Sequence, residues 1–140
     1  MKTIKPSLRM MFIAISLFSC NAQNSDNQKT GEVISGDIQV FYFHFTKRCV
    51  TCNAVENETK LTLKTFYSDK VKEGKIDFTS LNLEDNEGKE IAEALGVSGQ
   101  TLLIVKGDTH LNLTNEGFMN ARTNPEKFHE ILKSNIDKLL

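Results

Sequence analysis

The sequence predicts an α/β domain in which a small mixed β-sheet has helices on both faces, with its elements in the order β-α-β-α-β-β-α. The first observation is the run over 38–45, whose β-branched and aromatic residues place apolar side chains at both odd and even positions. That pattern is typical of a central strand covered on both faces. The second observation is that a helical stretch and another strand follow, and such a start requires a parallel pair joined by a right-handed crossover.

The first helix is expected to begin at Cys49, after a turn over 46–48. One set of residues recurs at spacings of 3, 4, 4 and 3, which places its members on a single helical face. This stripe comprises Cys52, Val55, Thr59, Leu63 and Phe66. We therefore expect that face to pack against the sheet.

The middle of the chain predicts a second strand over 76–83 and then a short helix. Asp85 or Asn86 can cap the start of this helix. Gly96 stands just past its end, where helices commonly finish with a glycine in the left-handed conformation.

The last third predicts a hairpin followed by a helix. A buried strand over 101–105 is joined by the turn residues 106–108 to a partner strand over 109–113. Asn124 is a suitable cap for the last helix, and Pro125 is suited to its first position.

The N-terminus predicts an export signal rather than part of the domain. Lys2, Lys5 and Arg9 form a positive region, and an apolar run over 10–18 follows that is too short to span a bilayer. The small residue before Cys20 resembles the bacterial lipoprotein box, in which the peptide is cut before a cysteine that is then acylated. The alternative is an ordinary signal peptide that is cut a few residues later.

Three segments follow from this interpretation: a lipoprotein-type signal peptide over 1–20, a polar and flexible tether over 21–36, and one domain over 37–140. We expect an exported protein of the bacterial cell envelope, held to the membrane by a lipid on Cys20 and facing the periplasm. Removal of 1–20 leaves 14 basic against 18 acidic residues, without a basic stripe. The charge pattern therefore does not suggest nucleic acid as a partner, and we expect a monomer.

The chemistry is predicted by cysteine spacing. Of three cysteines, Cys20 belongs to the signal, which leaves Cys49 and Cys52 as a C-x-x-C pair that can form a disulfide. The helix N-terminus and the adjacent Lys47 and Arg48 both favour a thiolate, the form that attacks disulfides. We assign Cys49 as the nucleophile and Cys52, one turn further on, as the resolving thiol.

Other uses of the pair remain open from the sequence. Structural zinc usually needs four ligands, and one C-x-x-C supplies two, so we expect no zinc and no cofactor. A soft-metal module is an alternative, in which Cys49 and Cys52, with His44 or Gln100, would hold Cu(I) or As(III). A locked structural disulfide is a third reading. His44 is expected to pack in its strand, and Glu56 to be a solvated helix residue.

Three blocks of sequence resemble a known family. Residues 37–105 look like a thioredoxin-superfamily domain, and the blocks 43–56, 99–107 and 120–128 are similar to the thioredoxin-like nitrophenyl compound nitroreductase subunits. The resemblance implies a thiol–disulfide oxidoreductase or electron-relay subunit that works with a membrane or periplasmic redox protein. It also associates the chain with reduction and export of nitroaromatic and aromatic arsenical compounds.

The resemblance also identifies departures from general thioredoxins. Those proteins carry a cis-proline before the third strand, whereas Gly99, Gln100 and Thr101 occupy this loop here, so a trans bond is expected and Gln100 is the residue that faces the dithiol. Phe43 falls where thioredoxins bury an acidic residue. Arg48 replaces the usual tryptophan, which implies an anionic partner surface.

Overall fold

The computed structural model describes residues 37–140. The predicted signal peptide, the acylation site at Cys20 and the tether over 21–36 lie outside the described residues. Within 37–140, no helix is both long and apolar enough to cross a membrane.

In the described part of the chain, the sheet has four strands in the spatial order β2-β1-β3-β4. Strand β1 (Ile38–His44) pairs in parallel with β2 (Ile76–Asn82) on one side and antiparallel with β3 (Thr101–Lys106) on the other. Strand β4 (Thr109–Asn112) forms the far edge as the hairpin partner of β3. The predicted mixed sheet with a central first strand is confirmed.

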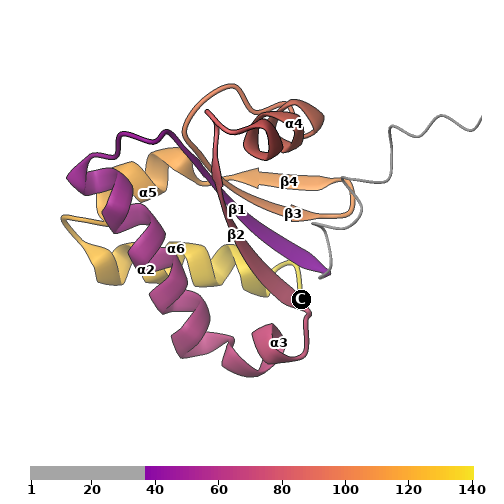
Figure 1. Cartoon of the computed structure of the whole chain (residues 1–140). Coiled ribbons are helices and arrows are strands. Elements are labelled where there is room, and N and C mark those ends of the chain that lie inside the picture. The colour runs from indigo at the N-terminus through magenta and orange to yellow at the C-terminus, as the bar shows by residue number, and fades with distance from the viewer. Residues whose placement is uncertain (1–36) are drawn as a thin grey trace, which may run out of the picture.

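Within residues 37–140, five helices flank the sheet: α2 (Val50–Phe66), α3 (Ser68–Lys72), α4 (Asn86–Ala94), α5 (Thr114–Asn120) and α6 (Pro125–Asp137). Figure 1 shows α4 on one side of the strands and α2, α5 and α6 on the other. The order is thus the predicted one with two further short helices, α3 and α5, inserted. As expected, Asn124 caps α6 by accepting from the amide of Lys127, while the side chain of Asp85 makes no capping bond at α4.

Successive side chains of β1 point to opposite faces of the sheet, so this strand contributes to the core on both faces. Ile38, Val40 and Tyr42 belong to the cluster beneath α2 and α6. Phe41 and Phe43 belong to the opposite cluster, which α4 covers. All five side chains are fully buried.

Helix α2 buries its predicted stripe with one exception. Cys52, Val55, Thr59 and Leu63 are buried, whereas Phe66 is 49% exposed. The prediction for Phe66 is wrong because the helix ends there and the chain turns into α3. The next residue, Tyr67, is buried instead, and its hydroxyl donates to Asp137 Oδ1 at 2.7 Å.

Candidate active site

The two cysteines lie at the start of α2, directly after the loop that leaves the central strand. Cys49 is the N-cap of the helix, and its sulfur accepts a hydrogen bond from the amide of Cys52 at 3.0 Å. The amide of Cys49 in turn donates to the sulfur of Cys52 at 3.2 Å. No acidic side chain occupies the first turn of α2. The N-terminal amides of a helix favour an anion, so negative charge on Cys49 is favoured here.

The structure joins Cys49 and Cys52 in a disulfide, with their Cα atoms 5.0 Å apart. The environments of the two residues differ: Cys49 is exposed, whereas Cys52 is only 3% exposed. A partner can therefore approach the sulfur of Cys49, while the sulfur of Cys52 is shielded by the fold.

Tyr42, on the central strand β1, supports the first turn of α2. Its side chain is fully buried, and its hydroxyl donates to the carbonyl oxygen of Cys52 at 3.0 Å. Burial raises the pKa of Tyr42, and this effect outweighs the nearby charge of Arg48, which acts in the opposite direction. The hydroxyl therefore remains a proton donor and fixes the cysteine backbone to the central strand.

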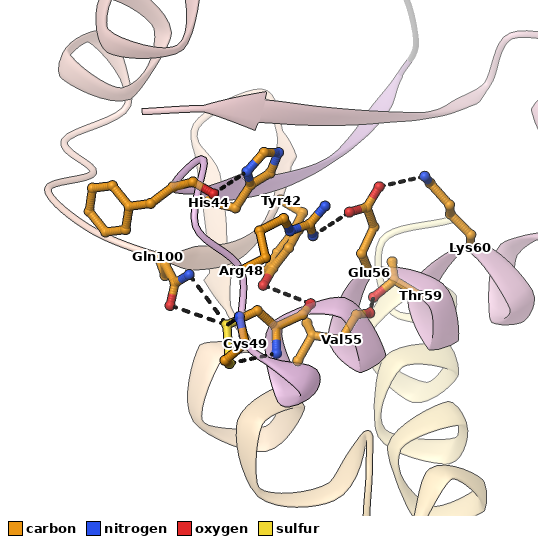
Figure 2. Close-up of polar contacts among 11 residues, drawn as sticks. Tyr42, His44, Arg48, Cys49, Val55, Glu56, Thr59, Lys60 and Gln100 are labelled. Atoms are coloured by element: carbon orange, nitrogen blue, oxygen red, sulfur yellow. Dashed lines mark hydrogen bonds and ion pairs between the residues drawn. A yellow bond between two sulfur atoms is a disulfide. The ribbon is translucent and has the colours of Figure 1, made fainter. Parts of the chain in front are cut away.

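A buried charge network lies beside this contact. The guanidinium of Arg48 lies over the ring of Tyr42, 5.4 Å from its centroid, and forms an ion pair with Glu56. Lys60 pairs with the other oxygen of Glu56 at 2.5 Å. Figure 2 shows Arg48 between Tyr42 and Glu56, with Lys60 beyond. The network links the residue before Cys49 to the second turn of α2.

The position of Glu56 shows that one expectation from the sequence, a solvated Glu56, is wrong. It also changes the role expected of Arg48. Glu56 is 7% exposed rather than solvated, because Arg48 and Lys60 neutralise it where it lies. Burial acts to raise the pKa of Glu56, but hydrogen bonds from Lys60 and Arg48 outweigh it, and the pKa is lowered. The charge of Arg48 is directed at Glu56, so this arginine offers a partner less positive charge than its place in the sequence implied.

Replacing Glu56 by Gln is expected to destabilise the domain at neutral pH by about 1.5–3 kcal/mol, the range for hydrogen bonds to charged groups. Because the folded-state pKa of Glu56 is lowered, its contribution to stability is complete above the unfolded-state pKa of ~4.3 and is lost as the pH falls through the folded-state pKa. Urea unfolding at pH 7 and near pH 3 measures both effects, and the loss relative to wild type should shrink at the lower pH.

Glu130→Gln is the matched control, since Glu130 is an exposed helical glutamate that forms no ion pair within 37–140. It should unfold like wild type at both pH values. Equal stability of Glu56→Gln and wild type at pH 7 would show that the buried network contributes nothing to folding.

Gln100 reaches the dithiol from the loop before β3, as the sequence predicted. Its side-chain nitrogen donates to the sulfur of Cys52 at 3.5 Å, and its oxygen lies 3.8 Å from the same sulfur (Figure 2). Thr101 begins β3, and its side-chain hydroxyl donates to the carbonyl of Gly99 at 2.9 Å, which closes the loop. No cis peptide bond occurs in the described residues, in agreement with the expected trans bond.

The remaining predicted residues are less closely tied to the sulfurs. Lys47 is exposed and takes part in no ion pair within the described chain. The ring of His44 bonds the carbonyl of Phe45 at 3.0 Å and tilts against the ring of Tyr42. Among residues 37–140, no three His, Cys, Asp or Glu side chains form a metal-binding group, so His44 does not join the cysteines in one.

Two residues of this site were missed from the sequence. Lys60 could have been found, because Glu56 and Lys60 are four residues apart in the favourable helical order. Tyr42 carried a weaker signal: it is the polar member of an aromatic strand, and buried tyrosines usually find a hydrogen-bond partner. Phe43, expected where thioredoxins bury an acid, lies fully buried in the apolar cluster under α4.

No family model and no curated protein matches the chain. Several solved structures are similar to it, among them the following two. One is a malarial protein, at 22% identity with a TM-score of 0.40, over 54% of this chain and 76% of that one. The other is human ERp44 in its zinc-bound form, at 9% identity with a TM-score of 0.54, over 78% of this chain.

The chain spans only 29% of the length of ERp44, a protein with a thioredoxin fold. At this identity the similarity concerns the fold alone, and the match to the malarial protein is too weak to add to it. The strand order, the helices on both faces and the similarity to ERp44 together give the chain a thioredoxin-like fold.

Proposed function

We propose that this domain is a thiol–disulfide oxidoreductase whose reactive group is the Cys49–Cys52 pair. The observation that carries the proposal is the asymmetry of the pair. Cys49 is an exposed residue at a helix N-terminus and its sulfur accepts an amide hydrogen bond, whereas Cys52 is buried one turn further on. A reactive cysteine needs access and stabilisation of its thiolate, and Cys49 has both.

In the reducing direction, the thiolate of Cys49 attacks one sulfur of a substrate disulfide. A mixed disulfide forms, and the other substrate sulfur leaves as a thiolate that takes up a proton. The thiolate of Cys52, formed by loss of its proton to water, then attacks Cys49, which closes the internal disulfide and releases the second substrate thiolate. Two electrons pass to the substrate, and the oxidising direction is the reverse of these steps.

Gln100 is positioned to support the first step, the attack by Cys49. Its amide donates to the sulfur of Cys52 in the disulfide, and in the dithiol its oxygen is placed to accept the proton of the Cys52 thiol. Holding that proton on Cys52 favours the thiolate on Cys49, where attack begins.

The test is the reduction potential of the Cys49–Cys52 pair, measured against a glutathione or thioredoxin couple. An exchange protein should fall between about -120 and -270 mV, the range of known exchange proteins. In the reduced protein, iodoacetamide should modify Cys49 well before Cys52 because of their different exposure. A potential below about -300 mV, typical of structural disulfides, would exclude the proposed activity.

A narrower role rests on the sequence blocks 43–56, 99–107 and 120–128. We propose that the chain is an electron-relay subunit for reduction of nitroaromatic or aromatic arsenical compounds, tethered at the envelope through Cys20 and working with a membrane or periplasmic redox protein. Expression of Cys52→Ser should trap such a protein as a mixed disulfide. Cys20→Ser should move the chain from the membrane fraction to the soluble one, and retention of Cys20→Ser in the membrane would rule out the lipid anchor.

A further inference from the structure

A hollow of about 290 Å³ lies between α2, α3 and the edge strand β2. Its lining includes one serine, Ser68, and three apolar residues, Leu63, Val71 and Phe78, which we call its floor. The dithiol lies at the opposite end of α2, since Leu63 belongs to the last turns of that helix and Cys49 caps its first. The hollow is therefore separate from the proposed redox site.

The rim of this hollow is cationic. Lys60, Lys64 and Lys72 line it, and no acidic residue does. Lys60 is already paired with Glu56, and Lys72 lies 3.7 Å from Asp69. Lys64 forms no ion pair with any residue in the described part of the chain, so its charge is available to a ligand.

Apolar surface is left uncovered at the same place. Val71 is 40% exposed, and the ring of Phe78 is only half-buried, with the ammonium of Lys60 5.4 Å from the ring centroid. An apolar floor beside an uncompensated cation suits a molecule with a hydrocarbon body and one negative charge. A cationic ligand would meet three lysines, and a fully polar one would leave the floor exposed to water.

We propose that this hollow binds a single-chain aliphatic carboxylate, with its chain on Leu63, Val71 and Phe78 and its carboxylate on Lys64. The volume lies at the lower limit of small-ligand sites, about 300 Å³, so it fits one short chain rather than a two-chain lipid. Lys60 joins the hollow to Glu56. Neither Lys64 nor Val71 forms a hydrogen bond or ion pair with the cysteines, Arg48 or Glu56, so variants at these two positions leave the proposed exchange site intact.

The test is titration of the purified full-length chain with hexanoate, octanoate and decanoate, followed by calorimetry and by amide NMR shifts. One equivalent should bind, with the shifts centred on the floor residues, and each added methylene should tighten binding about fourfold until the hollow is full. Octanol, which lacks the charge, should bind more weakly than octanoate.

Two variants separate the parts of the site. Lys64→Gln should weaken octanoate binding about two- to fivefold, the scale of an exposed ion pair, and leave octanol binding unchanged. Val71→Trp fills the hollow and should abolish binding of both. The matched controls are Lys127→Gln and Leu61→Trp, which should bind octanoate like wild type. Lys127 is exposed on α6, and Leu61 is exposed on α2 and does not line the hollow.

Retention of octanoate binding by Val71→Trp, or equal loss in the control variants, would overturn the proposal. Binding to anionic phospholipid vesicles without binding to any free carboxylate would also overturn it, and would indicate a membrane-facing surface instead. Disulfide exchange by Lys64→Gln should match wild type, so a failed carboxylate site and a failed exchange activity give different results.

Discussion

Cys49→Ser is expected to reduce disulfide exchange to the uncatalysed background. A serine hydroxyl cannot supply the thiolate that attacks a disulfide, and the remaining thiol of Cys52 is only 3% exposed. Cys52→Ser has a different expected outcome. Its Cys49 can still attack, but nothing resolves the product, so a stable mixed disulfide should accumulate. Single-turnover kinetics and non-reducing mass spectrometry with a disulfide peptide distinguish the two.

The asymmetry between these variants tests the assignment of roles. Thr109→Ser, at an exposed position of the edge strand β4, is the control for a serine placed away from the site and should exchange like wild type. Accumulation of the mixed disulfide in Cys49→Ser rather than in Cys52→Ser would reverse the roles. Full exchange by both variants would show that the pair is not the reactive group.

The features that the sequence predicted well depend on local patterns. Apolar residues of both parities in β1 required two covered faces, and the structure places Val40 and Phe41 on opposite ones. The C-x-x-C pair stands between a strand and a helix, which determined that Cys49 would lie at a helix N-terminus. Gln100 was expected at the dithiol from the resemblance to thioredoxins, which carry a cis-proline at this place in the loop, and its amide does contact Cys52.

The features that were missed depend on contacts between distant segments. Helix α5 was not expected, since its glycine is a poor helix former and Leu113 gives no side-chain cap. In the fold it packs on α2 and α6, where Gly117 lies beside the side chains of Val55 and Phe128. A single-sequence pattern contains no signal for such a three-way contact.

Glu56 illustrates the same limit inside the site. A glutamate on an amphipathic helix is usually solvated, and only the fold brings Arg48 close enough to neutralise it. Tyr42 is similar, because its partner is a backbone carbonyl ten residues further along the chain. The cysteine pair could thus be found from spacing, whereas the residues that hold it in place required the structure.

Gly88→Ala is expected to destabilise the fold strongly. Gly88 lies inside α4, where alanine normally gains up to about 1 kcal/mol in helix propensity. Here an added Cβ would lie 2.0 Å from the backbone oxygen of Asn82, the last residue of β2. Backbone cannot rotate away as a side chain can, so α4 must move off the strand, and overpacking of this kind costs typically about 1–3 kcal/mol and occasionally more. We expect a net loss of about 2 kcal/mol in the free energy of unfolding.

Gly117→Ala is the matched control, because it is also a buried helical glycine but its added Cβ would meet the side chain of Val55 at 3.2 Å. That side chain can adjust, and the propensity gain offsets the contact, so its stability should stay within about 1 kcal/mol of wild type. Urea unfolding measures both variants.

The amide of Val97 donates to the carbonyl of Ala92 at 2.7 Å, which couples α4 to the loop of Gln100. A displaced α4 should therefore also slow disulfide exchange in Gly88→Ala, whereas wild-type stability in this variant would mean that α4 is free to move off β2.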